Sequence, residues 1–358
     1  MIAFKLKPEA NDKANKRGMS LIELITVIFI GSLLLSMTFL VYTNSSRSML
    51  RQDVILEQLL NLRAGLAGIS RDIRGVGNGY AMLGLGQSQP ILMYTKDAAG
   101  DAVSWYQYPV VDGVTPPYGV APIYAVDGDQ NPDSIFVASL SPDFTAPLGR
   151  LSQPLESSSL SIKLSNQLEM PLGVDPKEII KRHDYLAVVP ATGPPILIEV
   201  DTDSTNLEEI AIKRMPAGPF PEAVDYAVGS TVYNVKNVVF HSYKIGTQGT
   251  TNETFLMLDT LDSENDIMAE GIEDLQAAYC FGDDDPSNLS NYVQDFSGLN
   301  TTDNPIKTIR LVLVSRTSRP DPYGKTFNRI PALNHTSLGP PDSYPRRFLE
   351  TSVQLRNF

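Results

Sequence analysis

A long uncharged apolar run near the amino terminus constrains this chain more than any other feature. No residue between Glu23 and Arg47 carries a charge, and the run is rich in Leu, Ile, Val and Phe. A membrane-spanning helix needs about 20 predominantly apolar residues, so this run is long enough to cross a bilayer. Glu23 lies at its start, where a carboxylate is costly unless it is paired or lies near the lipid headgroups.

The segment before the run is polar and basic, with Lys5, Lys7, Lys13, Lys16 and Arg17 against Glu9 and Asp12. By the positive-inside tendency, this segment stays in the cytoplasm and the bulk of the chain is exported. An ordinary secretory signal carries its cleavage site after the apolar stretch, whereas here any cut precedes the hydrophobic helix. In a bacterium with two membranes, the exported part faces the periplasm.

Helical periodicity continues past the apolar run. Apolar residues recur at alternating spacings of four and three, which places them on one face of a helix: Ile55, Leu59, Leu62, Leu66, Ile69 and Ile73. The opposite face is charged, with Arg51, Asp53, Glu57, Arg63 and Arg71. The glycine-rich "RGVGNGY" at 74–80 is typical of a helix end. The sequence therefore predicts one helix over 19–74, about 80 Å long at 1.5 Å per residue, whose second half covers a globular domain.

The chain after residue 80 is predicted to be rich in β-strands. Short runs of β-branched and aromatic residues are separated by clusters of Gly, Pro, Asn and Asp. The predicted strands are 91–95, 103–110, 134–140, 185–189, 196–200, 230–236, 238–243, 254–259, 307–316 and 347–355. The Pro-rich segment between the last two is predicted to be a surface loop. The expected fold class is α+β, with a long amino-terminal helix packed on a large β-rich globular domain.

Composition excludes several functional classes. The net charge of −12, with no basic block beyond the amino terminus, argues against a nucleic-acid surface. Cys280 is the one cysteine, so neither an intramolecular disulfide nor a multi-cysteine zinc site is available. The three histidines lie far apart, and no nucleophile-elbow or metalloprotease motif accompanies them. We therefore predict neither an enzyme nor a cofactor.

One acidic stretch, "DGDQNPD", leaves two interpretations open. Its oxygen-bearing residues alternate like the first ligands of a calcium loop: Asp127, Asp129, Asn131 and Asp133. Pro132 stands where an EF-hand loop has glycine, and Ala138 stands where it has the closing glutamate. A solvated turn rich in Asp, Asn and Pro accounts for the same residues. Calcium binding at extracellular concentrations is therefore a hypothesis beside the solvated turn.

The junction "RG" followed by "MSLIEL" resembles the class III signal of type IV prepilins and pseudopilins. That signal has a basic leader, a glycine at its last position, a hydrophobic first mature residue, a glutamate at mature position five and an unbroken apolar helix. Gly18, Met19 and Glu23 occupy those positions. The resemblance implies that a prepilin peptidase cuts between Gly18 and Met19 and that Met19 is N-methylated. Many pilins have phenylalanine at this first mature position.

The resemblance also implies a role for Glu23. In this family, the glutamate is thought to meet the amino-terminal amine of a neighbouring subunit as helices gather in the membrane and then in the filament core. A carboxylate inside a membrane is costly unless it is paired, and a free amine at Met19 exists only after cleavage. The alternative is that Glu23 lies at the headgroup boundary near the helix start, where a charge costs little.

Several later blocks resemble, in order, PilW-type minor pilins. They are "PDSIFVAS", "HDYLAVVPATGPPILIEVD", "GSTVYNVKNVVFHSYKI", "GIEDLQAAYCFGDDD", "IKTIRLVLVSRTSR" and "YPRRFLETSVQLRN". The most specific are "GIEDLQ" ahead of an aromatic and acidic turn, and the closing "YPRR". The chain lacks the cysteine pair that many minor pilins use, so burial of the core must hold its domain together.

This resemblance implies a type IV pilin-like organisation of four segments. They are a class III leader (1–18), a transmembrane and filament-core half of the helix (19–46), its amphipathic half (47–78) and a β-rich globular domain (79–358). The implied function is that of a minor pilin that helps to initiate pilus assembly in a tip-associated complex. The implied partners are other minor pilins, the major pilin, the prepilin peptidase, the inner-membrane assembly platform and, as a further candidate, a tip adhesin. The implied location is the inner membrane before assembly and the pilus tip afterwards.

Two alternatives remain from the sequence. The nearer is a J-type pseudopilin of a type II secretion system, which shares the amino terminus and the structural task but serves a different machine. The other is a membrane-anchored binding module in the periplasm or outside the cell, for which the acidic stretch at 127–133 is the best support. The identity of the partners would separate the first alternative from a pilus subunit.

Overall fold

The structure is a computed structural model of the chain. The residues that it describes are 20–85, 89–97, 99–108, 116, 118–128, 131–142, 147–165, 180–204, 208–216, 226–247, 253–260, 265–282, 284–294, 296, 298–299, 305–321, 323–333, 335 and 340–355. The chain divides into two compact units, Met1–Asp53 and Val54–Phe358.

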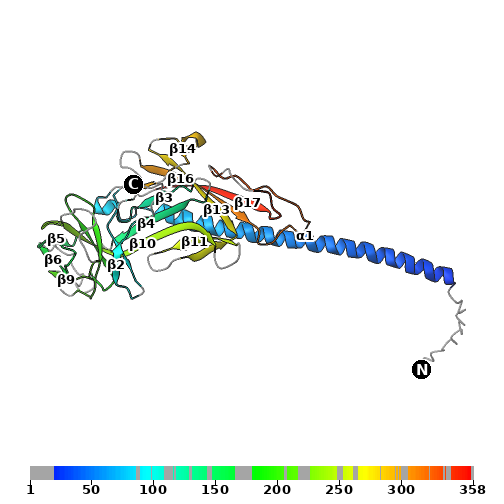
Figure 1. Cartoon of the computed structure of the whole chain (residues 1–358), viewed down its shortest axis with the longest axis horizontal. Coiled ribbons are helices and arrows are strands. Elements are labelled where there is room, and N and C mark those ends of the chain that lie inside the picture. Colours follow the sequence, from blue (N-terminus) through cyan, green and yellow to red (C-terminus); the bar gives the residue numbers. More distant parts are fainter. Residues whose placement is uncertain are drawn as a thin grey trace, which may run out of the picture. The chain divides into compact units, whose positions relative to one another are not determined.

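One long helix, α1 (Leu21–Gly75), supplies all the described helical residues of the first unit and begins the second (Figure 1). It confirms the helix predicted over 19–74, although Met19 lies outside the described residues. Turns follow at 76–80, where Gly77 and Gly79 take φ values of 71° and 84°. Glycine reaches this left-handed region without a steric penalty, which is why helices often end at it.

Antiparallel β-sheets follow α1 in the described part of the second unit and confirm the predicted α+β class. One sheet of eleven strands contains β3 (Ile123–Val126), β4 (Ser134–Pro142), β5 (Gly149–Leu151), β6 (Ser161–Ser165), β7 (Tyr185–Val189), β8 (Ile196–Glu199), β9 (Glu209–Ala211), β10 (Thr231–Thr247), β11 (Thr254–Asp259), β12 (Asp266–Glu270) and β15 (Gly298–Leu299). A second sheet has the order β14 (Tyr292–Val293), β13 (Ile272–Phe281), β16 (Ile306–Arg316), β17 (Arg346–Gln354). The remaining elements are the pair β1 (Tyr94–Lys96) and β2 (Ala102–Trp105), and the short 3-10 helices η1 (Ala81–Leu83) and η2 (Leu289–Asn291).

The longest strand, β10, replaces two predicted strands, 230–236 and 238–243. Its first residues pair with β7, its middle with β4 and its last residues with β11. Asn237, which separates the two predicted strands, lies at a register shift opposite β4. A bulge lets one strand carry an extra residue and bend without ending. The prediction of two separate strands was therefore wrong.

The strand predicted at 103–110 is also shorter than expected, because β2 ends at Trp105. The next residues join a cluster of aromatic rings instead of continuing the pair with β1. Tyr106 lies 5.0 Å from Phe240 between ring centroids, and Tyr108 stacks on Tyr124 at 4.0 Å. Packing of these rings provides more burial than an extension of a two-stranded ribbon would.

The second half of α1 packs into the main apolar core of the second unit. Leu62, Leu66, Ile69 and Ile73 are buried there with residues of β11, β13 and β16. Ile55 and Leu59 are half-buried, and Arg63 and Arg71 are exposed, so the predicted amphipathic face is confirmed. Two other large apolar clusters lie among the strands, and β10 contributes to all three of these clusters through Val232, Phe240 and Tyr243.

Candidate functional site

The first turn of α1 holds the residue that the sequence singled out. The Ser20 carbonyl accepts a hydrogen bond from the Leu24 backbone nitrogen at 3.1 Å, and the Ser20 nitrogen donates to Glu23 Oε2 at 2.9 Å. A Ser with a Glu three residues later, bonded in this way, has the carboxylate half of a capping box. Gly18 and Met19 lie outside the described residues.

The apolar half of α1 is long and apolar enough to cross a membrane. Its large side chains are exposed, among them Leu35, Phe39 and Tyr42. Its hydroxyl side chains donate to carbonyl oxygens one turn earlier in the same helix: Thr26, Ser32, Ser36, Thr38 and Thr43. Because a hydrocarbon environment offers no water, such internal bonds are the arrangement that a membrane-spanning helix requires.

Two amides fix the second half of α1 to both sheets. Gln58 is buried, and its Nε2 donates to the carbonyl oxygens of Ser315 at 3.3 Å and Pro345 at 3.2 Å. Asn61 Nδ2 donates to the carbonyl oxygen of Glu270, at the end of β12, at 3.1 Å. The two side chains reach different sheets within one turn of the helix, so this part of α1 is tied to both sheets.

Glycines let the helix approach the sheets closely. A Cβ atom at Gly65 would lie 2.9 Å from a methyl group of Leu256 on β11 and 3.1 Å from one of Leu313 on β16. A Cβ atom at Gly68 would overlap the end of Met268 on β12. Helix interiors usually disfavour glycine, so these two positions exchange helix propensity for close packing.

A polar cluster joins the last turn of α1 to β10. Asp72 Oδ2 lies 2.5 Å from His241 Nδ1 and accepts a hydrogen bond from the Tyr243 hydroxyl, and Asp72 Oδ1 lies 3.1 Å from Arg71 Nε. Burial tends to raise the pKa of Asp72, but these hydrogen bonds outweigh it and hold the pKa at about 2. The cluster therefore keeps a half-buried carboxylate charged and attaches the helix end to the longest strand.

Arg346, in the closing "YPRR" block, is held by two carboxylates. Its side chain is 1% exposed and forms two bonds with the Asp342 carboxylate, from Nη1 at 2.7 Å and from Nη2 at 2.6 Å. Its Nε donates to Glu273 of β13 at 2.7 Å. Paired guanidinium and carboxylate groups of this geometry are strong and directional. Arg346 therefore fixes the start of β17 to β13, two strands away.

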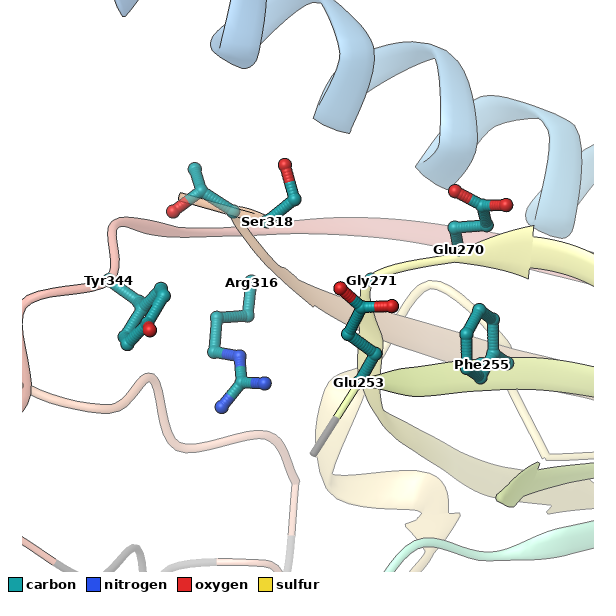
Figure 2. Close-up of a pocket in the computed structure, with 8 residues that line it drawn as sticks. Glu253, Phe255, Glu270, Gly271, Arg316, Ser318 and Tyr344 are labelled. Atoms are coloured by element: carbon teal, nitrogen blue, oxygen red, sulfur yellow. The ribbon is translucent and has the colours of Figure 1, made fainter. Parts of the chain in front are cut away.

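A surface cleft of about 330 Å³ lies beside this point (Figure 2). Glu253, Phe255, Glu270, Gly271, Arg316, Thr317, Ser318 and Tyr344 line it. Figure 2 shows the Arg316 side chain between Tyr344 and Glu253, and its guanidinium carbon lies 5.0 Å from the centre of the Tyr344 ring. The ring holds the guanidinium in place by a cation–π contact. The cleft thus offers both signs of charge to a polar group.

The acidic stretch proposed for calcium has a structural role at its last position. Asp133 is buried, and its two oxygens accept backbone N–H bonds from Gly128 at 3.0 Å and Ala277 at 2.8 Å. Burial chiefly, with the nearby charges of Asp127 and Asp274, raises the pKa of Asp133 to about 7. Asp129 lies outside the described residues. Among the described residues, no three His, Cys, Asp or Glu side chains converge on a metal position, and calcium binding stays a prediction.

Each histidine lies against a buried or half-buried carboxylate. His241 meets Asp72, His335 Nδ1 lies 2.7 Å from Asp274, and His183 Nδ1 lies 2.6 Å from Glu199. Glu199 is also within salt-bridge distance of Lys96 and Lys213. In each cluster the partners come from separate segments of the chain, so these contacts connect strands and loops.

Comparison with known families agrees with the geometry of the helix and of the second sheet. Residues 13–39 match the prokaryotic N-terminal methylation motif. Residues 242–357, which include the four-stranded sheet, match the model of type IV pilus-assembly protein W. Over these residues the chain is similar to the PilW-type minor pilins. Proteins of the matched family are structural pilins, and such pilins in general contact other pilins and the assembly machinery.

Two other comparisons accompany the family match. A type IV-like pilin from Thermus thermophilus is similar to this chain with 13% identity and a TM-score of 0.24, over 50% of this chain and 86% of that one. No curated protein sequence matches this chain. The apolar half of α1 and the methylation motif fit membrane anchoring and incorporation into a pilus.

The structure also identifies residues that the sequence did not single out. The Ser-x-x-Glu pattern before the apolar run is a known capping signal and could have been read from "SLIE". Gln58 carried no signal, because a lone amide at helical spacing is usually exposed. Asp72 carried none either, since its partners on β10 lie 169 and 171 positions away.

Proposed function

We propose that this chain is a minor pilin that helps to initiate type IV pilus assembly as part of a tip-associated minor-pilin complex. Other minor pilins and the major pilin are its partners in the filament, and the prepilin peptidase and the inner-membrane assembly platform act on it beforehand. The observation that carries this proposal is a single α1 whose first half is apolar and exposed and whose second half is tied to two sheets.

The amino terminus supplies the assembly chemistry in this proposal. Cleavage between Gly18 and Met19 creates a charged amine, and Met19 is then methylated. Glu23 uses Oε2 to accept the Ser20 N–H bond. A carboxylate has about four acceptor positions, so the same group can also receive the amine of a neighbouring subunit. Pairing of the two charges reduces the cost of keeping either in lipid.

The size of the second unit supports a place at the end of a filament. It extends from Val54 to Phe358 and is joined to the first unit through α1. Such a head on every subunit would crowd a helical array, whereas a few copies can be accommodated at a tip. A tip adhesin is then a further candidate partner of the second unit.

Complementation of a strain that lacks the chain tests this proposal. We expect few surface pili without the chain, normal numbers with the wild type, and gold-labelled antibody against the second unit at one end of sheared filaments. Normal piliation without the chain, together with its absence from sheared filaments, would contradict the role in initiation. Co-purification with secretion pseudopilins instead of pilus subunits would assign the chain to a type II secretion system.

A further inference from the structure

The cleft that Figure 2 shows lies where the eleven-stranded and four-stranded sheets meet, and backbone hydrogen bonds fix its floor. The Gly271 nitrogen donates to the carbonyl oxygen of Thr254, the first residue of β11, at 2.9 Å. The nitrogen of Arg316, the last residue of β16, donates to the Gly271 carbonyl oxygen at 2.8 Å. An added Cβ at Gly271 would lie 2.8 Å from the Arg316 carbonyl oxygen. The two sheets are therefore joined closely beneath the cleft.

One wall of the cleft holds a cation in a fixed direction. The guanidinium carbon of Arg316 lies 5.0 Å from the centre of the Tyr344 ring. Tyr344 is itself positioned, because its nitrogen donates to Asp342 Oδ1 at 3.0 Å and Asp342 is bonded to the buried Arg346. A guanidinium has five N–H donors in a planar fork that matches a carboxylate. Arg316 can therefore bind a carboxylate in addition to the contacts that it already makes.

The other wall of the cleft is acidic. Glu270 lies opposite Phe255 in the pairing of β12 with β11, so the two side chains lie on one face of this pair. In the view of Figure 2, Glu253 lies between Phe255 and Arg316. Glu253 and Glu270 are both exposed. This wall therefore offers two carboxylates as acceptors for an ammonium group, and Phe255 adds apolar surface.

The charges of the cleft favour a ligand that carries both signs. An anion would meet Arg316 but also two carboxylates, and a cation would meet the carboxylates but also Arg316. A ligand with both an ammonium and a carboxylate group can pair with both walls at once. The volume of about 330 Å³ is at the lower end of the range for small-molecule sites, about 300–1,000 Å³. The cleft therefore suits a ligand of about the size of one amino acid.

We propose that this cleft binds the zwitterionic group of an α-amino acid. Arg316 binds the carboxylate, and Glu253 and Glu270 bind the ammonium group. The rings of Phe255 and Tyr344 contact the amino-acid side chain. Outside the cytoplasm, this group occurs in free amino acids and in cell-wall peptides, where diaminopimelate can keep an α-amine and an α-carboxylate at one end. The site goes beyond the proposed pilin function and does not depend on it.

Isothermal titration calorimetry of the full chain in detergent tests this site with matched probes. Norleucine carries both charges, hexanoate lacks the amine, and pentylamine lacks the carboxylate. We expect saturable binding of norleucine at millimolar or lower concentration, and several-fold weaker binding of the other two. A muropeptide with an unlinked α-amino acid group on diaminopimelate separates the two sources. Tighter binding than that of norleucine assigns the cleft to the cell wall, and equal or weaker binding assigns it to free amino acids.

Two variants connect each charge of the ligand with its residue. Glu253→Gln should weaken norleucine binding several-fold and narrow its advantage over hexanoate, whereas Arg316→Gln should narrow its advantage over pentylamine. A purely structural role would weaken the binding of all three probes alike. Arg319 is exposed and does not line the cleft. Arg319→Gln should therefore change neither the affinities nor the melting temperature.

Three results would overturn the proposal. They are no heat from norleucine at millimolar concentration, binding of hexanoate or pentylamine as tight as that of norleucine, and tighter binding of glycerophosphoethanolamine, which would assign the cleft to a phospholipid headgroup. If Arg316→Gln does not fold, the exposed Glu253 still decides the question through Glu253→Gln. The titration needs neither cleavage nor filament assembly, so failure of this site leaves the pilin function standing, and the reverse also holds.

Discussion

The backbone nitrogen of Ser20 donates to Glu23 Oε2 at 2.9 Å and closes the first turn of α1. The carboxylate that begins the apolar run therefore has a partner within its own chain. In a membrane, this bond lowers the cost of the carboxylate before any other subunit arrives. In the proposed assembly, the amine of a neighbouring subunit is a second partner of the same group.

Substitution of Glu23 should separate these two roles. Glu23→Gln keeps an oxygen that can accept the Ser20 bond but removes the charge that a neighbouring amine would pair with. We expect several-fold less of this variant in sheared pili, with a normal amount in the membrane fraction, measured by immunoblot. Ser20→Ala keeps the backbone donor and should assemble like the wild type. Normal incorporation of Glu23→Gln would contradict charge pairing.

Gly79 should tolerate a side chain much less well than Gly84. Its φ is 84°, and an added Cβ would lie 2.4 Å from the Leu140 carbonyl oxygen, which is backbone and cannot easily move. Gly84 has a φ of 74° with nothing within 4 Å of an added Cβ. We expect Gly84→Ala to lose about 1 kcal/mol of unfolding free energy from strain alone, and Gly79→Ala to lose clearly more. Denaturant unfolding in detergent measures both, and equal losses would contradict the close approach.

The buried Asp133 should make stability depend on pH. Burial raises its pKa to about 7 in the folded state, against a usual value of 3.8. Its contribution is therefore complete below about pH 4 and is lost as pH rises through about 7. Asp133→Asn should lower the melting temperature, since an amide cannot accept both backbone bonds. The melting temperature of this variant should also fall less steeply between pH 5 and 8 than that of the wild type. An unchanged slope would contradict this assignment.

Asp72 should stabilise the folded chain at neutral pH and lose this effect in acid, the reverse of Asp133. Its folded pKa is about 2, below the usual 3.8. Its contribution is present above about pH 4 and is lost as pH falls through about 2. Asp72→Asn should therefore lower stability at pH 7 and show less additional loss between pH 4 and 2 than the wild type. Melting curves over that range provide the measurement, and parallel curves would contradict it.

The buried side chain of Gln58 should contribute more to the free energy of unfolding than the exposed side chain of Glu57 next to it. Gln58→Ala removes two bonds from a buried position. The Pro345 carbonyl also accepts from Thr317 at 3.0 Å, so it is not left without a donor. We expect a loss of about 1–3 kcal/mol in unfolding free energy. Glu57 is exposed, and Glu57→Ala should change it by less than about 0.5 kcal/mol.

The helix and its buried face could be predicted from the sequence because both follow from local periodicity. Leu62, Leu66, Ile69 and Ile73 repeat at the helical spacing and are buried where the pattern placed them. The end of α1 at the glycines of 75–79 is likewise a local signal. Such signals need no knowledge of the rest of the fold.

The parts that were not predicted depend on distant residues. β13 contains Asp274 and Gln276, which are buried because His335 and Asn131 satisfy them from far along the chain. Its sequence has few β-branched residues, so nothing local indicated a buried strand. Short strands such as β5 and β9 were missed for a similar reason, since three residues carry too little pattern. The polar contacts of α1 with the sheets are likewise tertiary.

The mass of the mature amino terminus tests the central claim most directly. The full chain is expressed with and without a prepilin peptidase, and the wild type is compared with Gly18→Ala. We predict a peptidase-dependent mass that corresponds to a chain beginning at Met19, with one added methyl group, and the loss of that product in Gly18→Ala. An uncut wild-type chain, in cells that process their other prepilins, would contradict the account and would reduce the apolar half of α1 to a membrane anchor.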